Sequence, residues 1–150
     1  MKICVFALFT AATLLARSGG VDVYTPQDLQ TLSKKLAAKR IATATEELQR
    51  YGNHYTMIAF RDATGSSELH EKEADIFVVE EGEATLLTGG KLIHSHAEKP
   101  GELRGTSIEG GERHMLTKDS IVHIPAGTPH QLLIEKGKPF TYFVIKVIQQ

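Results

Sequence analysis

From Tyr55 onward the sequence consists of short β-rich runs separated by turn residues, and this pattern limits the fold more than any other feature. The runs are Tyr55–Arg61, Ser67–His70, Ile76–Val79, Ala84–Leu87, Lys91–Ile93, Ile121–Ile124, His130–Ile134 and Phe140–Ile148. Runs this short, with no helices between them, cannot build a parallel α/β sheet. The sequence therefore predicts an all-β sandwich or barrel, for which a double-sheet jelly roll is the most economical arrangement.

One helix is expected before the strands. Thr25 is a suitable N-cap, Pro26 follows at the first helical position, and Asp28 lies three residues after the cap, which together predict a helix start. Leucines then recur at helical spacing, so we expect an N-terminal α-helix packed against the domain. A further short helical turn is expected over Thr45–Tyr51.

The first residues indicate export. Lys2 is followed by an apolar run from Ile3 to Ala16 and then by Arg17-Ser18-Gly19-Gly20. A basic start, a short apolar run and a small-residue exit are typical of a secretory signal peptide, whereas a spanning helix needs about 20 apolar residues. We predict a signal peptide over 1–18, a helical extension over 19–52 and a barrel over 53–150. The mature protein would then be periplasmic or secreted, with no stable membrane anchor.

Composition narrows the partners. The chain has 150 residues, 41% of them apolar, which suffices for one core. Its formal net charge is −1, and its acidic and basic residues are spread along the chain. This pattern disfavours a nucleic-acid partner and favours a small-molecule ligand. The only cysteine, Cys4, lies in the predicted leader, so any metal must be held by histidine and carboxylate. Phosphate-binding glycine loops and serine-hydrolase elbows are absent from the sequence.

The clearest chemical pattern lies in Glu68, His70 and Asp75. Side chains two residues apart on a strand share a face, so Glu68 and His70 point the same way. A turn over residues 71–74 would return Asp75 beside them. Lys72 shares that face if the strand continues, and it could replace a metal ion by pairing with Glu68 or Asp75.

This stretch resembles the first motif of the cupin family, G-x5-H-x-H-x(3,4)-E-x6-G. Asp75 and Gly82 keep the six-residue gap of the motif. His70 takes the place of the second histidine, and Glu68 replaces the first. That exchange puts a carboxylate where the family has an imidazole.

The second cupin motif, G-x5-P-x-G-x2-H-x3-N, matches at Pro125–His130. Asp119 takes the place of its first glycine, and aspartate tolerates a left-handed backbone better than most residues. Ile134 takes the place of its asparagine. The resemblance covers residues 55–147 and implies a cupin-like double-stranded β-helix, or jelly-roll barrel, and a homodimer.

The resemblance also implies a divalent metal inside the barrel, held by Glu68, His70, Asp75 and His130. Two imidazoles with one or two carboxylates suit Fe, Mn, Ni or Zn. A metal-dependent enzyme of the oxygenase, isomerase or lyase type would then act on a small organic molecule. Two alternatives stay open: a metal-free exported module that binds a sugar or similar metabolite, and a structural dimer without a ligand.

Several other polar residues are weaker candidates for the pocket. Arg104, in a segment from His94 to Gly105 that we expect to be a polar surface loop, could clamp a carboxylate or form a surface ion pair. Gln131 and Tyr142 are candidate polar groups on strands. His123 would line the pocket or be a hydrogen-bonded structural residue, whereas His94 and His96 are expected to be solvated.

Overall fold

The computed structural model describes residues 20–149, so the predicted signal peptide lies almost entirely outside the described residues. One helix, α1 (Pro26–Ala37), comes before the strands. The strands are β1 (Thr43–Arg50), β2 (His54–Arg61), β3 (Ser67–His70), β4 (Glu73–Glu81), β5 (Ala84–Thr88), β6 (Lys91–Ile93), β7 (His96–Lys99), β8 (Glu102–Gly105), β9 (Ser107–Glu109), β10 (Glu112–Leu116), β11 (Ile121–Ile124), β12 (His130–Leu133) and β13 (Phe140–Ile148). Within the described residues, no helix is long and apolar enough to cross a membrane.

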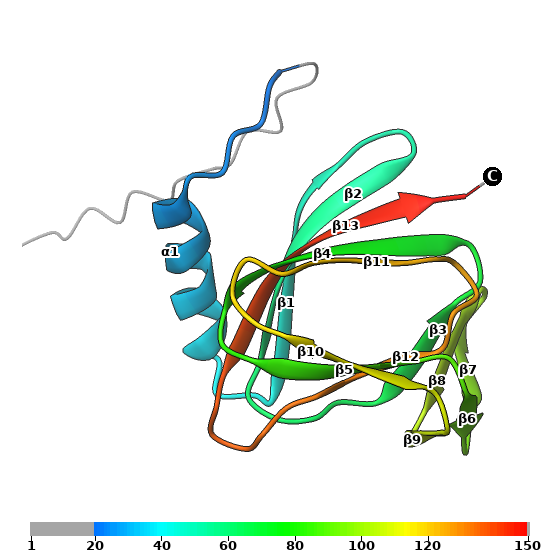
Figure 1. The fold of residues 1–150 in the computed structure, drawn as a ribbon. Coiled ribbons are helices and arrows are strands. Elements are labelled where there is room, and N and C mark those ends of the chain that lie inside the picture. The colour runs from blue at the N-terminus through cyan, green and yellow to red at the C-terminus, as the bar shows by residue number, and fades with distance from the viewer. Residues whose placement is uncertain (1–19, 150) are drawn as a thin grey trace, which may run out of the picture.

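The strands form two facing antiparallel sheets, as Figure 1 shows. The first sheet has the order β1-β2-β13-β4-β11 and the second the order β10-β5-β12-β3-β8-β7. A small ribbon, β6-β9, extends beside the second sheet. The last strand, β13, lies between β2 and β4, so strands far apart in sequence are neighbours. The predicted all-β jelly roll is confirmed.

The apolar core fills the space between the sheets. Strand β13 shows where this core ends. On β13 the buried residues Phe140, Tyr142 and Val144 alternate along the chain and share the inward face. Lys146 is the next residue on that face and is also buried, at 8% exposure. The apolar core therefore continues directly into a polar chamber at this end of the strand.

Helix α1 begins as the sequence predicts. Thr25 and Asp28 form a capping box, in which the backbone N–H of Thr25 donates to Asp28 Oδ2 at 2.9 Å. Leu36 is fully buried against Ile58 and Phe60, so the helix covers the outer face of the first sheet. The Ser33 and Thr141 hydroxyls lie 2.9 Å apart in this interface, which gives both buried hydroxyls a hydrogen-bond partner.

Two local predictions are wrong. The segment expected as a helical turn, Thr45–Tyr51, lies largely in strand β1, which pairs antiparallel with β2. Ala44, Glu46 and Leu48 are less exposed than the residues between them, and this two-residue period belongs to a strand.

The expected surface loop from His94 to Gly105 contains strands β7 and β8 instead. Strand β8 lies between β3 and β7. Its Glu102 is only 6% exposed and accepts a hydrogen bond from Arg104. The polar composition of this segment resembled that of a solvated loop because its inward-facing charges are paired with one another.

Two turn positions marked by the cupin resemblance have a left-handed backbone. Gly82 has φ +85°, and a Cβ there would collide with the carbonyl of Pro139. Asp119 has φ +67°, the left-handed conformation anticipated from its place in the second motif. These turns follow β4, which carries Asp75, and precede β11, which pairs with it.

Candidate metal centre

Strands β3 and β12 bring three potential metal ligands together. Glu68 and His70 lie two residues apart on β3, and His130 opens β12 directly opposite Glu68 in the strand register. Each of the three offers one ligand atom, and these atoms all lie within 4.8 Å of one another. The expectation that Glu68 and His70 share a face therefore agrees with the structure, which adds His130 from the neighbouring strand.

The spacing of these atoms suits a transition-metal ion. His70 Nε2 lies 3.6 Å from Glu68 Oε2, and His130 Nε2 lies 3.7 Å from Glu68 Oε1. Ligand atoms at about 2.1 Å from a tetrahedral ion are about 3.4 Å from one another. The gap among the three side chains is thus close to the size that such an ion requires.

The two imidazoles present unpaired nitrogens to this gap. His130 Nδ1 lies 3.0 Å from the carbonyl oxygen of Thr128; since a carbonyl only accepts, Nδ1 donates this bond and Nε2 is the nitrogen left to face the gap. His130 Nε2 and both ring nitrogens of His70 are buried without a hydrogen-bond partner among the described residues. Buried polar atoms are seldom left unpaired, so these nitrogens are fitted to receive a metal ion.

Electrostatics favour the metal-binding protonation states. Burial lowers the pKa of His70, and the nearby Lys146 lowers it further, so the imidazole is neutral near pH 7. Burial alone would raise the pKa of Glu68, but His130, Arg104 and Arg61 bring it below the ordinary value. Neutral imidazoles and an ionised carboxylate are the forms that bind a divalent ion.

Asp75 reaches the same gap from the opposite sheet. Its Oδ2 lies 3.5 Å from His130 Nε2 and 3.7 Å from His70 Nε2. Its other oxygen, Oδ1, lies 2.6 Å from Lys146 Nζ, since Lys146 is directly opposite Asp75 in the register of β13 and β4. Burial opposes ionisation of Asp75, but its close contact with His130 and the charge of Lys146 lower its pKa overall.

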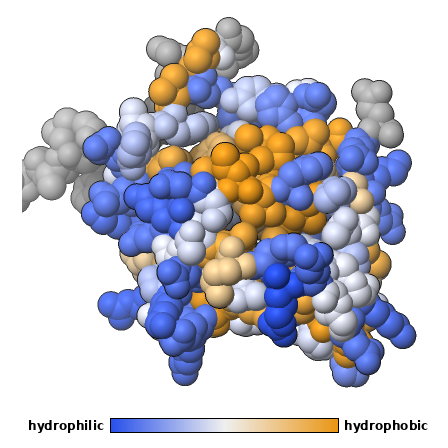
Figure 2. All heavy atoms as spheres, viewed as in Figure 1, coloured by the Kyte–Doolittle hydropathy of each residue, from blue (hydrophilic) through white to orange (hydrophobic). Residues whose placement is uncertain are grey.

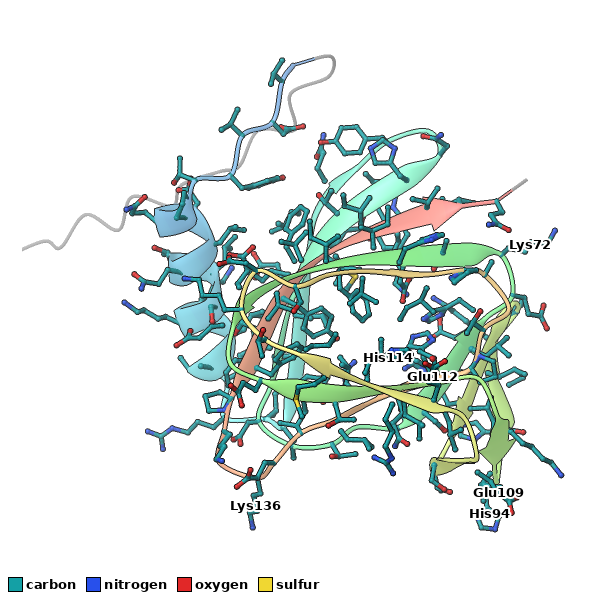
Figure 3. All side chains as sticks on the ribbon, in the orientation of Figure 1. Lys72, His94, Glu109, Glu112, His114 and Lys136 are labelled. Carbon is teal, nitrogen blue, oxygen red and sulfur yellow. The ribbon has the colours of Figure 1, made fainter. Side chains whose placement is uncertain are left out.

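The lysine that pairs with Asp75 differs from the one considered from the sequence. Strand β3 ends at His70, so Lys72 lies in the following turn, where it is exposed and points away from the barrel (Figure 3). Lys146, 71 positions beyond Asp75, takes the place beside the carboxylate. The alternation of Tyr142, Val144 and Lys146 on β13 was the available signal, because it places all three on one face.

Two arginines and Glu102 surround Glu68. Arg104, opposite Glu68 in the register of β3 and β8, donates hydrogen bonds to both Glu68 and Glu102. Arg61, at the end of β2, donates to the hydroxyl of Tyr142 at 2.9 Å and to Glu68 Oε1 at 3.5 Å. Arg104 was a candidate from the sequence, whereas Arg61 and Glu102 were missed.

Glu68 and the charged residues around it line a cavity of about 360 Å³ between the sheets. Tyr142 lies in its wall, and Met57, Phe77 and Val144 supply apolar surface. Gln131 is buried but outside this lining, and its amide donates to the backbone oxygen of Gly65 at 2.8 Å. Its observed role is therefore to hold a loop.

His123 lies at the opposite edge of the sandwich. It is exposed on β11 and lines an apolar groove of about 500 Å³ between the edge strands β10 and β11. Met115 and Ile121 are 68% and 74% exposed in this groove, and Figure 2 shows apolar side chains gathered on this face. His94 and His96 are exposed, as expected.

Comparison with known proteins identifies the fold through structure and not through sequence. No family model and no curated protein matches the sequence. Among solved structures, the Schizosaccharomyces pombe Cnp3 cupin domain is similar with a TM-score of 0.54 and 7% identity, over 73% of this chain and 66% of that one. The cupin domain of an XRE family transcriptional regulator from Enterobacter cloacae has a TM-score of 0.52 and 16% identity, over 73% and 100% of the two chains.

The DMSP lyase DddQ from Ruegeria pomeroyi is also similar, with a TM-score of 0.50 and 19% identity, over 74% of this chain and 49% of that one. The present chain thus spans about half the length of the lyase structure. Three structures that share so little sequence with the chain are similar to it in fold. The protein therefore has the cupin fold, with a buried Glu/His/His group inside it.

Proposed function

We propose that the protein binds one divalent transition-metal ion through Glu68, His70 and His130. The observation that carries the proposal is the set of buried imidazole nitrogens without hydrogen-bond partners, which face an ionised carboxylate across a gap of suitable size. Asp75 adjoins both imidazoles and is held by Lys146. In this proposal Asp75 is a neighbouring carboxylate whose coordination is limited by the lysine.

Two imidazoles and one carboxylate with open positions suit Fe, Mn, Ni or Zn, and such an ion supplies a Lewis acid that can polarise a bound small molecule. The protein groups around it have distinct tasks. The Thr128 carbonyl fixes the ring of His130, and Arg104 and Arg61 orient Glu68. Such outer partners keep metal ligands in position.

The substrate would be a small organic molecule in the cavity beside these residues. The cavity volume of about 360 Å³ falls within the range of small-ligand pockets. One structurally similar protein is a DMSP lyase, which is consistent with lyase chemistry on this fold. Because a fold hosts unrelated activities, oxygenase, isomerase and lyase reactions all stay within the proposal.

Metal content tests the proposal. Tag-free protein expressed in metal-supplemented medium should contain close to one equivalent of Fe, Mn, Ni or Zn by mass spectrometry of the elements. His70→Ala and His130→Ala should each lose most of it, whereas His123→Ala, an exposed histidine away from the site, should retain it. Metal-free wild-type protein, or equal metal content in all four proteins, would contradict the proposal.

A metal-free binding module is the second candidate function. It is favoured by the ion pair of Lys146 with Asp75, because the lysine already neutralises one of the four residues that the cupin resemblance assigns to the metal. Ligand-induced thermal stabilisation that survives a chelator would support this candidate. Loss of all such stabilisation with EDTA would exclude it.

Export and self-association belong to the proposal as well. The basic start and the apolar run before Arg17 support export, which N-terminal sequencing of protein from the periplasm or medium would test. A start near Gly19 is expected, and a start at Met1 would contradict it. The homodimer expected from the cupin resemblance stays a prediction for light scattering.

A further inference from the structure

The charges in the cavity are balanced without a metal ion. Four cationic residues and four carboxylate residues line it, namely Arg61, Lys99, Arg104 and Lys146 against Glu68, Glu73, Asp75 and Glu102. A divalent ion bound at Glu68, His70 and His130 would add two positive charges to this balanced set. In a site of low dielectric constant, this excess favours an anionic occupant.

Arg61 has spare hydrogen-bond donors in this cavity. Its side chain is only 10% exposed, yet among the described residues its side-chain acceptors are the Tyr142 hydroxyl and one oxygen of Glu68 at 3.5 Å. A guanidinium carries five N–H donors. A buried arginine with unused donors facing a cavity is suited to bind a ligand that carries an acceptor pair.

Metal binding would release further donors. Arg104 and Arg61 both donate hydrogen bonds to Glu68. When Glu68 coordinates a divalent ion, its negative charge is partly neutralised. Its hydrogen bonds with Arg61 and Arg104 are then weaker. Arg104 keeps Glu102, and its 27% exposed side chain leaves it accessible from the cavity mouth.

The shape of the cavity limits the rest of the ligand. Met57, Ala59, Phe77 and Val144 line the wall that the first sheet contributes. These side chains offer contacts to a short hydrocarbon body. Arginine binds carboxylates in a planar, two-point geometry that matches an organic acid.

We propose that the cavity binds a small organic carboxylate, with its carboxylate group on Arg61 and Arg104 and its hydrocarbon part against Met57 and Phe77. This inference rests on the proposed metal site, because the bound ion supplies the excess positive charge and draws Glu68 away from the arginines. It predicts that metal and carboxylate bind with positive coupling.

Calorimetric titration of the zinc-loaded full chain tests the proposal, with acetate, malonate, succinate and glutarate as probes. Succinamide serves as a neutral analogue and inorganic phosphate as a competing anion class. Arg61→Gln and Arg104→Gln remove one guanidinium each. Arg113→Gln is the matched control, because Arg113 is exposed on β10 outside the cavity. Zinc content and circular dichroism are recorded for every protein.

We expect at least one of the four carboxylates to bind the zinc-loaded protein. The affinity for that carboxylate should fall by at least about tenfold in Arg61→Gln and in Arg104→Gln, because each loses the bonds from one guanidinium. The affinity should not change in Arg113→Gln. Removal of zinc should weaken it to a similar degree. Succinamide should not bind measurably.

If Arg61→Gln does not fold, Gly65→Ala provides a second test of the role of Arg61. A Cβ at position 65 would lie 2.6 Å from Arg61 Nη1, so it should displace the guanidinium without removing its charge. Carboxylate affinity should fall in this variant while zinc content stays at one equivalent.

Full zinc loading with no carboxylate binding, equal binding of succinamide, or tighter binding of phosphate than of every carboxylate would overturn this inference alone. Equal affinity in the arginine variants and Arg113→Gln would do the same. Failure of zinc, and equally of Fe, Mn and Ni, to bind would overturn the proposed metal site and this inference together, so the two failures are distinguishable.

Discussion

At the scale of single residues, the exchange of an imidazole for Glu68 changes more than one ligand. A carboxylate at this position needs compensating charge because it is buried, and the structure supplies Arg104 and Arg61 for it. Asp75 is compensated in the same manner by Lys146. Glu68 and Asp75 are therefore each held by their own cations, with His70 and His130 between them.

The ion pair of Lys146 and Asp75 should be coupled in stability. Lys146→Met leaves a buried carboxylate without its cation, which should lower the free energy of unfolding of metal-free protein by about 3–5 kcal/mol. Asp75→Asn in the same chain should recover much of this loss. Urea denaturation of the two single variants and the double variant gives the coupling energy. Additive losses would contradict the pairing.

The stability of metal-free protein should depend on pH through His70. Burial lowers the pKa of His70, so the unfolded chain takes up a proton near pH 6.5 before the folded chain does. The free energy of unfolding should therefore fall as the pH falls below about 6.5. It should decrease less in His70→Gln. If the free energy of unfolding of the wild-type protein rose as the pH was lowered from 7 to 6, and that of His70→Gln did not, the predicted sign would be contradicted.

The carboxylates act in a lower pH range. The pKa values of Glu68 and Asp75 are both lowered in the fold, so their contribution is complete above their ordinary values and is lost as the pH falls through the folded ones. Below about pH 4.5 a second loss of stability should therefore follow the one from His70. His70→Gln should reduce the first loss and keep a second one, because the arginines beside Glu68 and Lys146 beside Asp75 stay in place.

At the scale of elements, the sequence predicts the positions that local pattern determines. The capping box of α1 and the turns at Gly82 and Asp119 follow from residues close together in the chain. The pairing of β3 with β8, and thus the contact of Arg104 with Glu68, depends on register between distant strands. The alternation on β13 places Lys146 on the inward face, but its pairing with Asp75, like the contact of Arg61 with Glu68, depends on register between distant strands.

The segment before the barrel motif is part of the same packing. Leu36 on α1 is fully buried against the outer face of the first sheet. Leu36→Ala should lower the free energy of unfolding by about 2–5 kcal/mol, as measured by chemical denaturation. Lys39→Ala, at an exposed position after the helix, is the control and should change stability little. Equal effects of the two substitutions would show that α1 does not pack as described.

At the scale of the whole molecule, the site joins the two sheets. Glu68, His70 and His130 come from the second sheet, whereas Asp75, Lys146 and Arg61 come from the first. An ion held on one side and contacted by a carboxylate from the other would stabilise the sandwich as a unit. Metal binding should therefore stabilise the whole domain against unfolding.

Zinc should raise the midpoint of thermal unfolding. An ion that binds only the folded state, at a free concentration of 100 times its dissociation constant, stabilises it by about 2.7 kcal/mol. The increase should disappear with EDTA and should be absent in His130→Ala. Differential scanning calorimetry measures it, and an increase of the same size in His130→Ala would place the ion elsewhere.

Anomalous diffraction from crystals of the metal-loaded protein tests the central claim most directly. The account predicts one anomalous peak at the absorption edge of the bound metal, within about 2.0–2.2 Å of His70 Nε2, His130 Nε2 and an oxygen of Glu68. Lys146 should stay paired with Asp75. A fully loaded crystal whose peak lies away from these three side chains, or an amine of Lys146 in the gap between them, would contradict the account.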